Sequence, residues 1–449
     1  MKHTISILLT LLLSTITYAQ FAGEWKGKLV MGQTELALVF KFVQHDSVVT
    51  GTLDVPQQGA KDLPIDKIYV SDNNISLSIS AIGFNYDGKL DESNSTIEGS
   101  MSQNGYSFPL VLKPNIKVNR PQTPKSPFPY KQEEVVFYNY LDNNKFTGTL
   151  VTPLLMKPTT PIAILVSGSG QQNRDEELME HKPFWVIADY LARNGIATLR
   201  YDDRGVGGSG TINLLNSTTE TFKTDAASAI KYLKEKGYLN IGVIGHSEGG
   251  LIAYMLGAES DDLCFIVSLA GTAVGGDQIL IEQNRLLLEK SGVPQATTSS
   301  YCELLSEIYT LKKKQTTDYL AQNREQIITD LKYKYSTLPD QLKANIPALL
   351  QSQPWIDFFI TYDPTPALKQ IKCRTLALNG EKDVQVIASQ NISAAQSHIP
   401  SNLLTTKIYP NLNHLFQNCE TGMPIEYAQI EETISPEVLK DIVNWIRKN

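Results

Sequence analysis

The chain has 449 residues, 42% of them hydrophobic, which is enough for at least two hydrophobic cores. Its formal net charge of -7 gives no electrostatic reason to expect nucleic acid or an anionic membrane as a partner. The four cysteines show no metal-ligand spacing, and the sequence does not define their disulfide state. We expect neither a metal nor a cofactor, and the oligomeric state stays open.

The first residues, MKHTISILLTLLLSTITYAQ, are typical of a cleaved secretory signal peptide. A short basic start precedes an apolar run from Ile5 to about Ile16, and small residues precede Ala19. The run is shorter than the ~20 residues that span a bilayer. We therefore expect a signal peptide at 1–19, an exported protein (periplasmic or extracellular) and no stable membrane anchor. An uncleaved anchor is the alternative.

Residues 20–113 are predicted to form a small all-β domain. Short runs such as ELALVFKFV, VVTGTLDVP, NISLSISAIG and YSFPLVLKP are separated by Gly, Asn, Asp and Pro. About eight strands at this spacing indicate a small barrel or sandwich. Residues 114–130 follow as a proline-rich linker, in which the prolines favour an extended, semi-rigid chain.

After this linker, residues 131–449 change to strands that alternate with helices. Two antiparallel strands, EEVVFYNY and KFTGTLVTP, come first, and PIAILVSGSG, IATLRYDD, IGVIGHS, CFIVSLAG and CRTLALNG follow as nearly continuous apolar strands. Such strands between amphipathic helices predict a mostly parallel sheet with helices on both faces. Residues from about 275 to 366, between two of these strands, are predicted to be a helical lid insertion. Cys264, which opens CFIVSLAG, is expected in the core.

The stretch GHSEG, from Gly245 to Gly249, matches the pattern G-x-S-x-G. An apolar strand precedes it and a helical pattern follows, so the glycines flank a strained turn that exposes the hydroxyl of Ser247. This context favours a nucleophilic serine. A glycine turn with a bystander serine is the alternative.

A nucleophilic serine needs a base and a group that orients the base. His414 follows a strand and a turn in KIYPNLNHLFQ, and Asp383 follows the strand TLALNGEKD. The carboxyl ends of parallel strands meet at one edge of a sheet, so these residues can converge on Ser247. A capping carboxylate and a solvated loop histidine are the alternatives. The other histidines are less suitable: His3 is in the signal, His45 is in the β domain, His181 and His398 have helix-like contexts, and His246 adjoins the serine and is expected to point elsewhere.

A tetrahedral oxyanion needs hydrogen-bond donors. The backbone N–H of Glu248, the residue after the nucleophile, is one candidate. The glycine turn after ILVSGSG can direct further backbone N–H groups into the site. The side chain of Glu248 is expected to leave on the helix face.

From Tyr130 onward the chain resembles the α/β-hydrolase superfamily, specifically the secreted bacterial esterase-like members grouped with serine aminopeptidase-like hydrolases. The resembling stretches are VSGSGQQNRDE, YDDRGVGGS, GHSEGG, LALNGEKD and NLNHLFQ. The resemblance implies an α/β-hydrolase fold, with Ser247 as nucleophile, His414 as base and Asp383 as acid. It also implies backbone oxyanion donors at Ser169 and Glu248. Ser167 departs from the family, because many relatives have His there in H-G-x-G.

The stretch GVGGSG, from Gly205 to Gly210, satisfies the dinucleotide-binding pattern G-x-G-x-x-G, and Asp225 lies 20 residues beyond its first glycine (225 − 205). That fingerprint requires the glycines to open a helix, yet TINLLNSTTE follows. Without a helix N-terminus a phosphate lacks its binding site, so we expect no cofactor here.

These observations favour an exported serine hydrolase that cleaves small-molecule carboxylic esters through an acyl-enzyme on Ser247. An exported peptidase with the same triad is the alternative enzyme, and a glycan- or surface-binding module led by the β domain is the alternative outside enzymes. A charged run near the oxyanion turn could bind a charged substrate end, although such runs are usually solvated. Its residues are Arg174, Asp175, Glu176 and Glu177.

Overall fold

The computed structural model divides the chain into two compact units, Met1–Lys117 and Val118–Asn449, here called the β unit and the α/β unit. The predicted signal peptide lies outside the described residues. None of the helices that the structure describes is long and apolar enough to cross a membrane. The described residues are 21–31, 34–45, 48–55, 58, 60–91, 96–103, 105–114 and 119–448.

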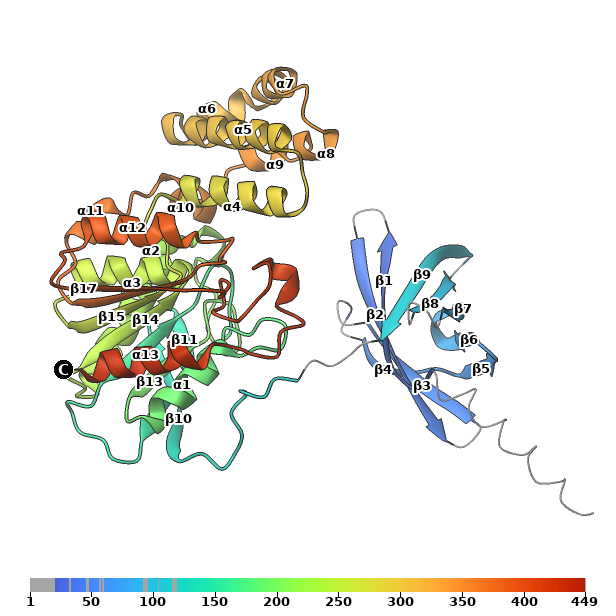
Figure 1. Ribbon diagram of the computed structural model, residues 1–449, viewed down its shortest axis with the longest axis horizontal. Helices are drawn as coiled ribbons and strands as arrows, with labels where there is room; N and C mark the ends of the chain where they lie inside the picture. Colours follow the sequence, from blue (N-terminus) through green and yellow to red (C-terminus); the bar gives the residue numbers. More distant parts are fainter. Residues whose placement is uncertain are drawn as a thin grey trace, which may run out of the picture. The chain divides into compact units, whose positions relative to one another are not determined.

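The β unit is one antiparallel sheet in the order β4-β3-β2-β1-β9-β8-β7-β6-β5 (Figure 1). Its edge strands, β4 and β5, are consecutive in the chain, so the sheet curls back towards itself. The prediction of a small all-β domain is confirmed, and the single curled sheet is closer to a barrel than to two stacked sheets. The strands of the described residues are β1 (Gly23–Met31), β2 (Thr34–His45), β3 (Val48–Val55), β4 (Ala60–Pro64), β5 (Lys67–Ser71), β6 (Asn74–Ile79), β7 (Phe84–Asp91), β8 (Thr96–Gln103) and β9 (Tyr106–Pro114).

Alternating side chains of these strands fill the inside of the curl. Phe40, Tyr86 and Ile97 are fully buried there, and the Tyr86 hydroxyl contacts the carbonyl oxygens of Ile97 and Leu110 at 3.1 and 3.2 Å. A buried phenol requires such partners, because an unpaired hydroxyl in a core costs free energy. The sheet therefore has its own core.

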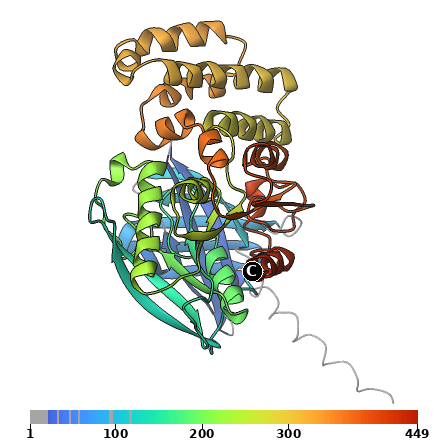
Figure 2. The same ribbon diagram turned by 90° about the vertical axis from the view of Figure 1, so that its left-hand side faces the viewer.

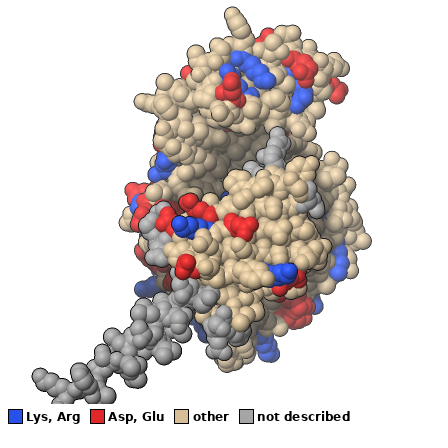
Figure 3. Space-filling view, turned by 90° about the vertical axis from the view of Figure 1, so that its right-hand side faces the viewer, with Lys and Arg blue, Asp and Glu red and all other residues tan. Residues whose placement is uncertain are grey.

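Charges of both signs lie next to one another on the face shown in Figure 3, rather than in separate patches. In the β unit, for example, Lys41 Nζ lies 2.6 Å from Asp54 and 2.7 Å from Asp62. On this face the charges are thus mixed.

The α/β unit contains a mixed sheet in the order β10-β11-β13-β12-β14-β15-β16-β17. β10, β11 and β13 are antiparallel neighbours, and every pairing from β13 to β17 is parallel, with Ile162 of β12 opposite Ile241 of β14. This order is that of an α/β-hydrolase fold, as predicted. The strands are β10 (Tyr130–Tyr138), β11 (Lys145–Pro153), β12 (Ile162–Val166), β13 (Ala197–Tyr201), β14 (Ile241–His246), β15 (Leu263–Leu269), β16 (Arg374–Gly380) and β17 (Leu404–Tyr409).

Helices cover both faces of this sheet (Figures 1 and 2). One face packs against α1 and α13, and the other packs against α2, α3 and α12. The central strands are buried along their whole length, which explains their continuous apolar sequences. The helices are α1 (Pro183–Arg193), α2 (Thr219–Glu235), α3 (Glu248–Glu259), α12 (Ala388–His398) and α13 (Pro436–Arg447).

A helical insertion lies between β15 and β16, where a lid was expected. Its longer helices form a core of their own, centred on Leu304 and Ile308. A second apolar cluster joins the insertion to the rest of the α/β unit, because Ile279 and Phe359 pack on Leu251 of α3. Its helices are α4 (Gly276–Lys290), α5 (Gln295–Lys314), α6 (Thr317–Gln322), α7 (Arg324–Lys334), α8 (Asp340–Lys343), α9 (Ile346–Leu350), α10 (Pro354–Thr361) and α11 (Thr365–Lys369).

Candidate active site

Ser247 occupies a strained turn between β14 and α3. Its φ and ψ are 54° and -118°, a combination that non-glycine residues rarely adopt. The turn is held because the N–H of Ser247 donates to the carbonyl oxygen of Leu269 at 2.9 Å. Such a turn lifts the hydroxyl above the end of the sheet.

Two glycines allow this turn to be tight. A Cβ at Gly245 would lie 1.8 Å from the carbonyl oxygen of Gly249, and a Cβ at Gly249 would lie 2.1 Å from that of Val166. Both distances are far below van der Waals contact. The glycines of G-x-S-x-G are therefore required by the close approach of strand, turn and helix.

The structure brings Asp383 and His414 together, although 31 residues separate them. His414 Nδ1 lies 2.7 Å from Asp383 Oδ2, and both side chains are buried. The other oxygen of Asp383 accepts the N–H groups of Gln385 and Val386 at 2.8 and 2.9 Å. These donors hold the carboxyl group in a position from which it can orient the imidazole.

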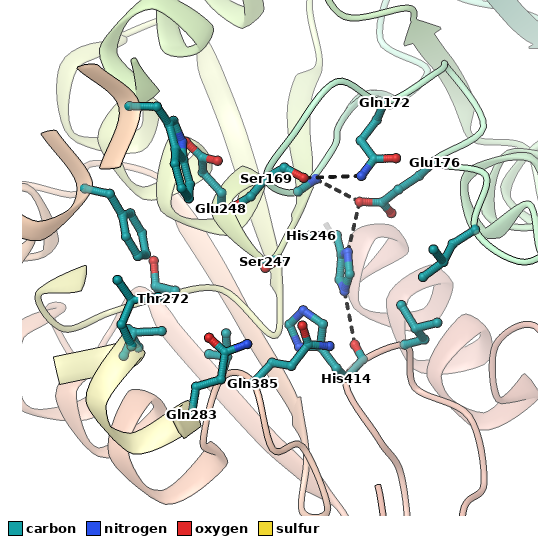
Figure 4. A pocket seen from close by; sticks show the side chains of 18 residues that line it. Ser169, Gln172, Glu176, His246, Ser247, Glu248, Thr272, Gln283, Gln385 and His414 are labelled. Atoms are coloured by element: carbon teal, nitrogen blue, oxygen red, sulfur yellow. Dashed lines mark hydrogen bonds and ion pairs between the residues drawn. The ribbon is translucent and has the colours of Figure 1, made fainter. Parts of the chain in front are cut away.

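Ser247 and His414 line one cavity of about 310 Å³ (Figure 4). Its walls combine apolar side chains, among them Ile279, Trp355 and Phe359, with the amides of Gln172, Gln283 and Gln385. No Lys or Arg occurs among the described residues that line it. The lining is thus mixed, with apolar side chains beside polar ones that include Glu176 and Glu248, and such a pocket suits a small-molecule substrate.

The predicted oxyanion donors lie beside this cavity, which Ser169 and Glu248 both line. Within the described part of the chain, neither backbone N–H has a protein acceptor. The N–H of Gly168 is occupied, because it donates to Glu176 Oε1 at 2.8 Å. Two free N–H groups thus remain where a substrate carbonyl can approach Ser247.

Ser167, at the position where the resemblance implies a histidine, anchors the turn after β12, here called the oxyanion turn. Its hydroxyl donates to Asp203 Oδ2 at 2.8 Å, and the N–H of Gln172 donates to the same oxygen at 3.0 Å. Withdrawal from solvent raises the pKa of Asp203 to about 8, with Glu176 and Asp225 as nearby negative charges. The turn is therefore tied to the loop after β13.

His246 was expected to point away from the site, and this was wrong. It lines the same cavity as Ser247. Its Nδ1 lies 2.9 Å from Glu176 Oε1, and its Nε2 lies 3.0 Å from the backbone oxygen of His414 (Figure 4). In a strand, the side chains of successive residues point to opposite faces, which is why His246 was expected to point away from Ser247. However, β14 ends at His246, and the loops after two other strands pack over its ring.

The side chain of Glu248 was expected to leave on the helix face, whereas in the structure this side chain is buried beside the cavity. It is 2% exposed, and its Oε1 accepts the Thr219 hydroxyl at 2.7 Å and the Trp355 indole N–H at 2.8 Å. Burial raises the pKa of Glu248, while donors from Thr219, Trp355 and Ser169 lower it. α3 is buried all round, so it has no solvent face here.

The charged run that follows the oxyanion turn is paired within the protein, although Glu177 at its end is exposed. Arg174 pairs with Asp202 at 2.8 Å and with Glu134 at 2.6 Å. Asp175 pairs with the buried Arg200, and Glu177 lies 3.4 Å from Lys182. Each charge is neutralised within the protein, so the run fastens its loop to the sheet.

Three further expectations can be compared with the structure. His181 is buried, with its ring nitrogens in contact with the Thr433 hydroxyl and the backbone oxygen of Tyr427, and His398 is the last residue of α12. Neither is among the described residues that line the cavity with Ser247. Asp225 binds the buried Arg204 at 2.6 Å, and the glycine loop before it opens no helix, since α2 begins at Thr219. Cys264 was expected in the core, but it is exposed. It is the second residue of β15, near the end where the strand begins.

Comparison with known proteins adds to this geometry. A family model described as serine aminopeptidase, S33, matches residues 182–349. Esterase EstD of Thermotoga maritima is 25% identical over 314 residues, which cover 68% of this chain and 66% of the esterase. An acyl transferase of Photobacterium leiognathi is 30% identical over 131 residues, which cover 29% of this chain and 39% of the transferase. The matches thus span less than two thirds of these relatives.

Solved structures with a similar chain path include an esterase of Pyrococcus furiosus and a proline iminopeptidase of Mycobacterium smegmatis. The esterase is 14% identical with a TM-score of 0.40, and the match covers 71% of this chain and 93% of that one. The iminopeptidase is 14% identical with a TM-score of 0.43, and the match covers 70% of this chain and 98% of that one. With the strand order described above, the chain has an α/β-hydrolase fold, and it is similar to esterases and to the serine aminopeptidase family model.

Proposed function

We propose that this protein is an exported serine hydrolase that cleaves carboxylic esters. The observation that carries the proposal is the 2.7 Å contact between Asp383 and His414 at the cavity that Ser247 also lines. The hydroxyl of Ser247 attacks the ester carbonyl while His414 Nε2 takes its proton. Asp383 holds the imidazole by Nδ1 and stabilises the imidazolium that forms.

The negative charge that develops on the carbonyl oxygen is received by the N–H groups of Ser169 and Glu248. Donors that are already in place need no reorganisation during the reaction, and one such donor contributes ~2.7–4 kcal/mol to transition-state stabilisation in comparable sites. His414 then protonates the departing alcohol. A water molecule, activated by the same imidazole, releases the acid from Ser247.

Cleavage of peptides is the competing activity, and the description of the matched family model favours it. An aminopeptidase must hold a free ammonium group, normally with a carboxylate. The candidate acids Asp175 and Glu176 are already paired with Arg200 and His246. Glu248 is bound by two donors through Oε1, whereas its buried Oε2 forms no hydrogen bond within the described part of the chain. The pairings of Asp175 and Glu176 support esters over peptides.

The experiment combines covalent labelling with two substrate series. A fluorophosphonate is expected to label Ser247 in the wild-type protein, and Ser247→Ala is expected to lose both labelling and hydrolysis of short-chain nitrophenyl esters. Ser260→Ala, at the other end of α3, is the control and should keep both. Aminoacyl anilides should be cleaved slower than the esters by orders of magnitude. Labelling of a different serine would refute the assignment, and comparable kcat/KM for the two series would favour the peptidase.

A further inference from the structure

Both ring nitrogens of the buried His246 face acceptor atoms. Nε2 lies 3.0 Å from the backbone oxygen of His414, which can only accept. Nδ1 lies 2.9 Å from Glu176 Oε1, which already accepts the N–H of Gly168. A neutral imidazole has one N–H and would leave one contact without a proton. An imidazolium beside a carboxylate satisfies all three hydrogen bonds.

This pair joins three segments of the α/β unit that are far apart in sequence. Gly168 precedes Ser169 in the turn after β12, and His246 ends β14. His414 follows β17, and its ring lies against that of His246 with centroids 4.7 Å apart. The two halves of the proposed site, the oxyanion donors and the base, are therefore connected through one ion pair.

We propose that Glu176 and His246 are positioning residues of the proposed esterase reaction: the imidazolium of His246 holds the main chain of His414, and the carboxylate of Glu176 holds the oxyanion turn. Neither touches the reacting atoms. The inference rests on the proposed function, but the charge state of His246 can be tested without substrate. The Glu176–His246 pair lies beside the Asp383–His414 pair. It sets the distance between the base, His414, and the oxyanion donors.

The surroundings of His246 support its charged form. Burial opposes the charge, but the Glu176 carboxylate, the His414 carbonyl and Asp383 outweigh burial, and the pKa of His246 is raised above its ordinary value. The groups that face the pair are Asp383 and His414 beside His246, and Asp203 beside Glu176. A raised pKa means that the ion pair persists to higher pH than it would with an ordinary imidazolium, and that it is lost as the pH rises through that pKa.

The first test measures ester hydrolysis by Glu176→Gln, His246→Gln and the double variant. A glutamine at position 176 can accept a hydrogen bond from Gly168 or from His246, but it carries no charge that would stabilise the imidazolium. We expect kcat to fall roughly 10–100-fold in each single variant, with KM within about threefold, because the lost bonds involve charged groups. The double variant should lose little more than the worse single variant, since both remove the same pair. Glu177→Gln, on the same loop, is the matched control and should behave as wild type.

The pH profile separates positioning from general damage to the fold. Activity of the wild type should decline at alkaline pH as His246 loses its proton. In Glu176→Gln this decline should move to lower pH, because the counter-ion is gone, while Glu177→Gln keeps the wild-type profile. A merely structural role would lower activity without moving the profile. Wild-type kcat and an unshifted profile in a folded Glu176→Gln protein would overturn the proposal.

A spectroscopic measurement keeps the proposal testable if the variants fold poorly. With ¹⁵N-labelled histidine, the wild-type protein at pH 7 should show His246 with protons on both ring nitrogens. Its signals are assigned as those absent from the ¹⁵N-histidine-labelled His246→Gln protein or, if that protein does not fold, as those that shift in Glu176→Gln. A neutral His246 in the wild type would overturn the proposal. If instead the wild type hydrolysed no ester and bound no fluorophosphonate, the proposed function would fail while the charge state of His246 stayed measurable.

Discussion

Trp355 of α10 donates its indole N–H to Oε1 of Glu248 across 2.8 Å, so the helical insertion is bonded to the residue that follows the nucleophile. The indole ring also stacks on Phe359, with centroids 5.4 Å apart and planes 10° apart. Glu248 provides an oxyanion donor through its backbone in the proposed mechanism. A shift of the insertion would therefore change the position of Glu248 and of its backbone N–H.

Trp355→Phe tests this connection. Phenylalanine keeps an aromatic ring on Phe359 but removes the donor to a buried carboxyl. We expect a loss of about 1.5–3 kcal/mol in folding free energy, as for other hydrogen bonds to charged groups, and a roughly tenfold lower kcat/KM for esters. Because the lost donor favours the ionised carboxyl, the stability gap to wild type should widen as the pH rises.

The control for this variant is Trp445→Phe in α13. Trp445 is partly buried, and its indole N–H donates at 3.1 Å to the hydroxyl of Thr405, a neutral acceptor, in an exposed hydrogen bond. Thermal unfolding and ester kinetics should show a small effect there. Equal effects of the two substitutions would mean that the bond to Glu248 has no special importance.

A second prediction concerns the strain at Ser247. Its φ of 54° with ψ of -118° suits glycine, and strain of this kind costs about 1–3 kcal/mol. Ser247→Gly should therefore melt at a higher temperature than Ser247→Ala, even after glycine's greater entropy in the unfolded chain is counted. Both variants should be inactive.

Ser291→Gly provides the matched control, because Ser291 ends α4 with a φ of -82°. There glycine relieves no strain and should lower the melting temperature. If Ser247→Gly were destabilised to the same extent as Ser291→Gly, the turn would store no strain.

The sequence predicted the fold well because each element carried a local signal. The apolar strands are buried on both faces, and the glycines of G-x-S-x-G are dictated by backbone contacts within a few residues of Ser247. Asp383 and His414 could be chosen because each follows a strand of a parallel sheet, and such ends share one edge. Their contact in the structure follows from topology alone.

Other parts of the site could not be predicted, since they depend on how loops from different strands meet. Glu176 has a φ of 51° and turns its carboxylate towards Gly168 and His246, a direction that no spacing encodes. The bond from Trp355 to Glu248 joins residues 107 apart through the insertion. The short helices of the insertion carry few periodic apolar positions, so only its longer helices were visible in the sequence.

A third prediction concerns where the α/β unit begins. In the sequence, the candidate catalytic residues all lie beyond the proline-rich linker at 114–130. In the structure, Arg120 donates to the carbonyl oxygens of Met179, Ala428 and Ile430 at 2.9, 2.9 and 2.8 Å. Gln122 also bonds the backbone of residues 433 and 434. The second part of the linker is thus fastened to the α/β unit.

A chain of residues 119–449 should therefore fold and hydrolyse small esters, whereas residues 130–449 should be less stable by on the order of 2–4 kcal/mol, the sum of a few hydrogen bonds. Arg120→Ala in the full chain should shift the melting temperature in the same direction. Equal melting temperatures for the two shortened chains would show that these contacts contribute nothing. A folded but inactive 119–449 chain would mean that the β unit contributes to the site.

The last prediction is a pH dependence of stability that originates at Asp203. Its pKa is raised from 3.8 to about 8 in the folded protein, first by withdrawal from solvent. Between these values the unfolded chain has lost the proton while the folded protein keeps it, so ionising the folded state costs free energy as the pH rises. Stability from this carboxyl is thus fully present below about pH 4 and is lost progressively up to about pH 8.

Asp203→Asn removes this titration and keeps an oxygen that can accept from Ser167 and Gln172. Its melting temperature, measured at pH 5, 6, 7 and 8, should rise relative to wild type at each step. Asp330→Asn, at an exposed position of α7, should show no such trend. The oxyanion turn is held by the oxygen of residue 203 that accepts from Ser167 and Gln172, and asparagine keeps such an oxygen. Ester hydrolysis by Asp203→Asn should therefore change less than its stability does. A constant difference in melting temperature across the series would mean that Asp203 is ionised in the folded protein, and that the turn is held by a charge rather than by a neutral acid.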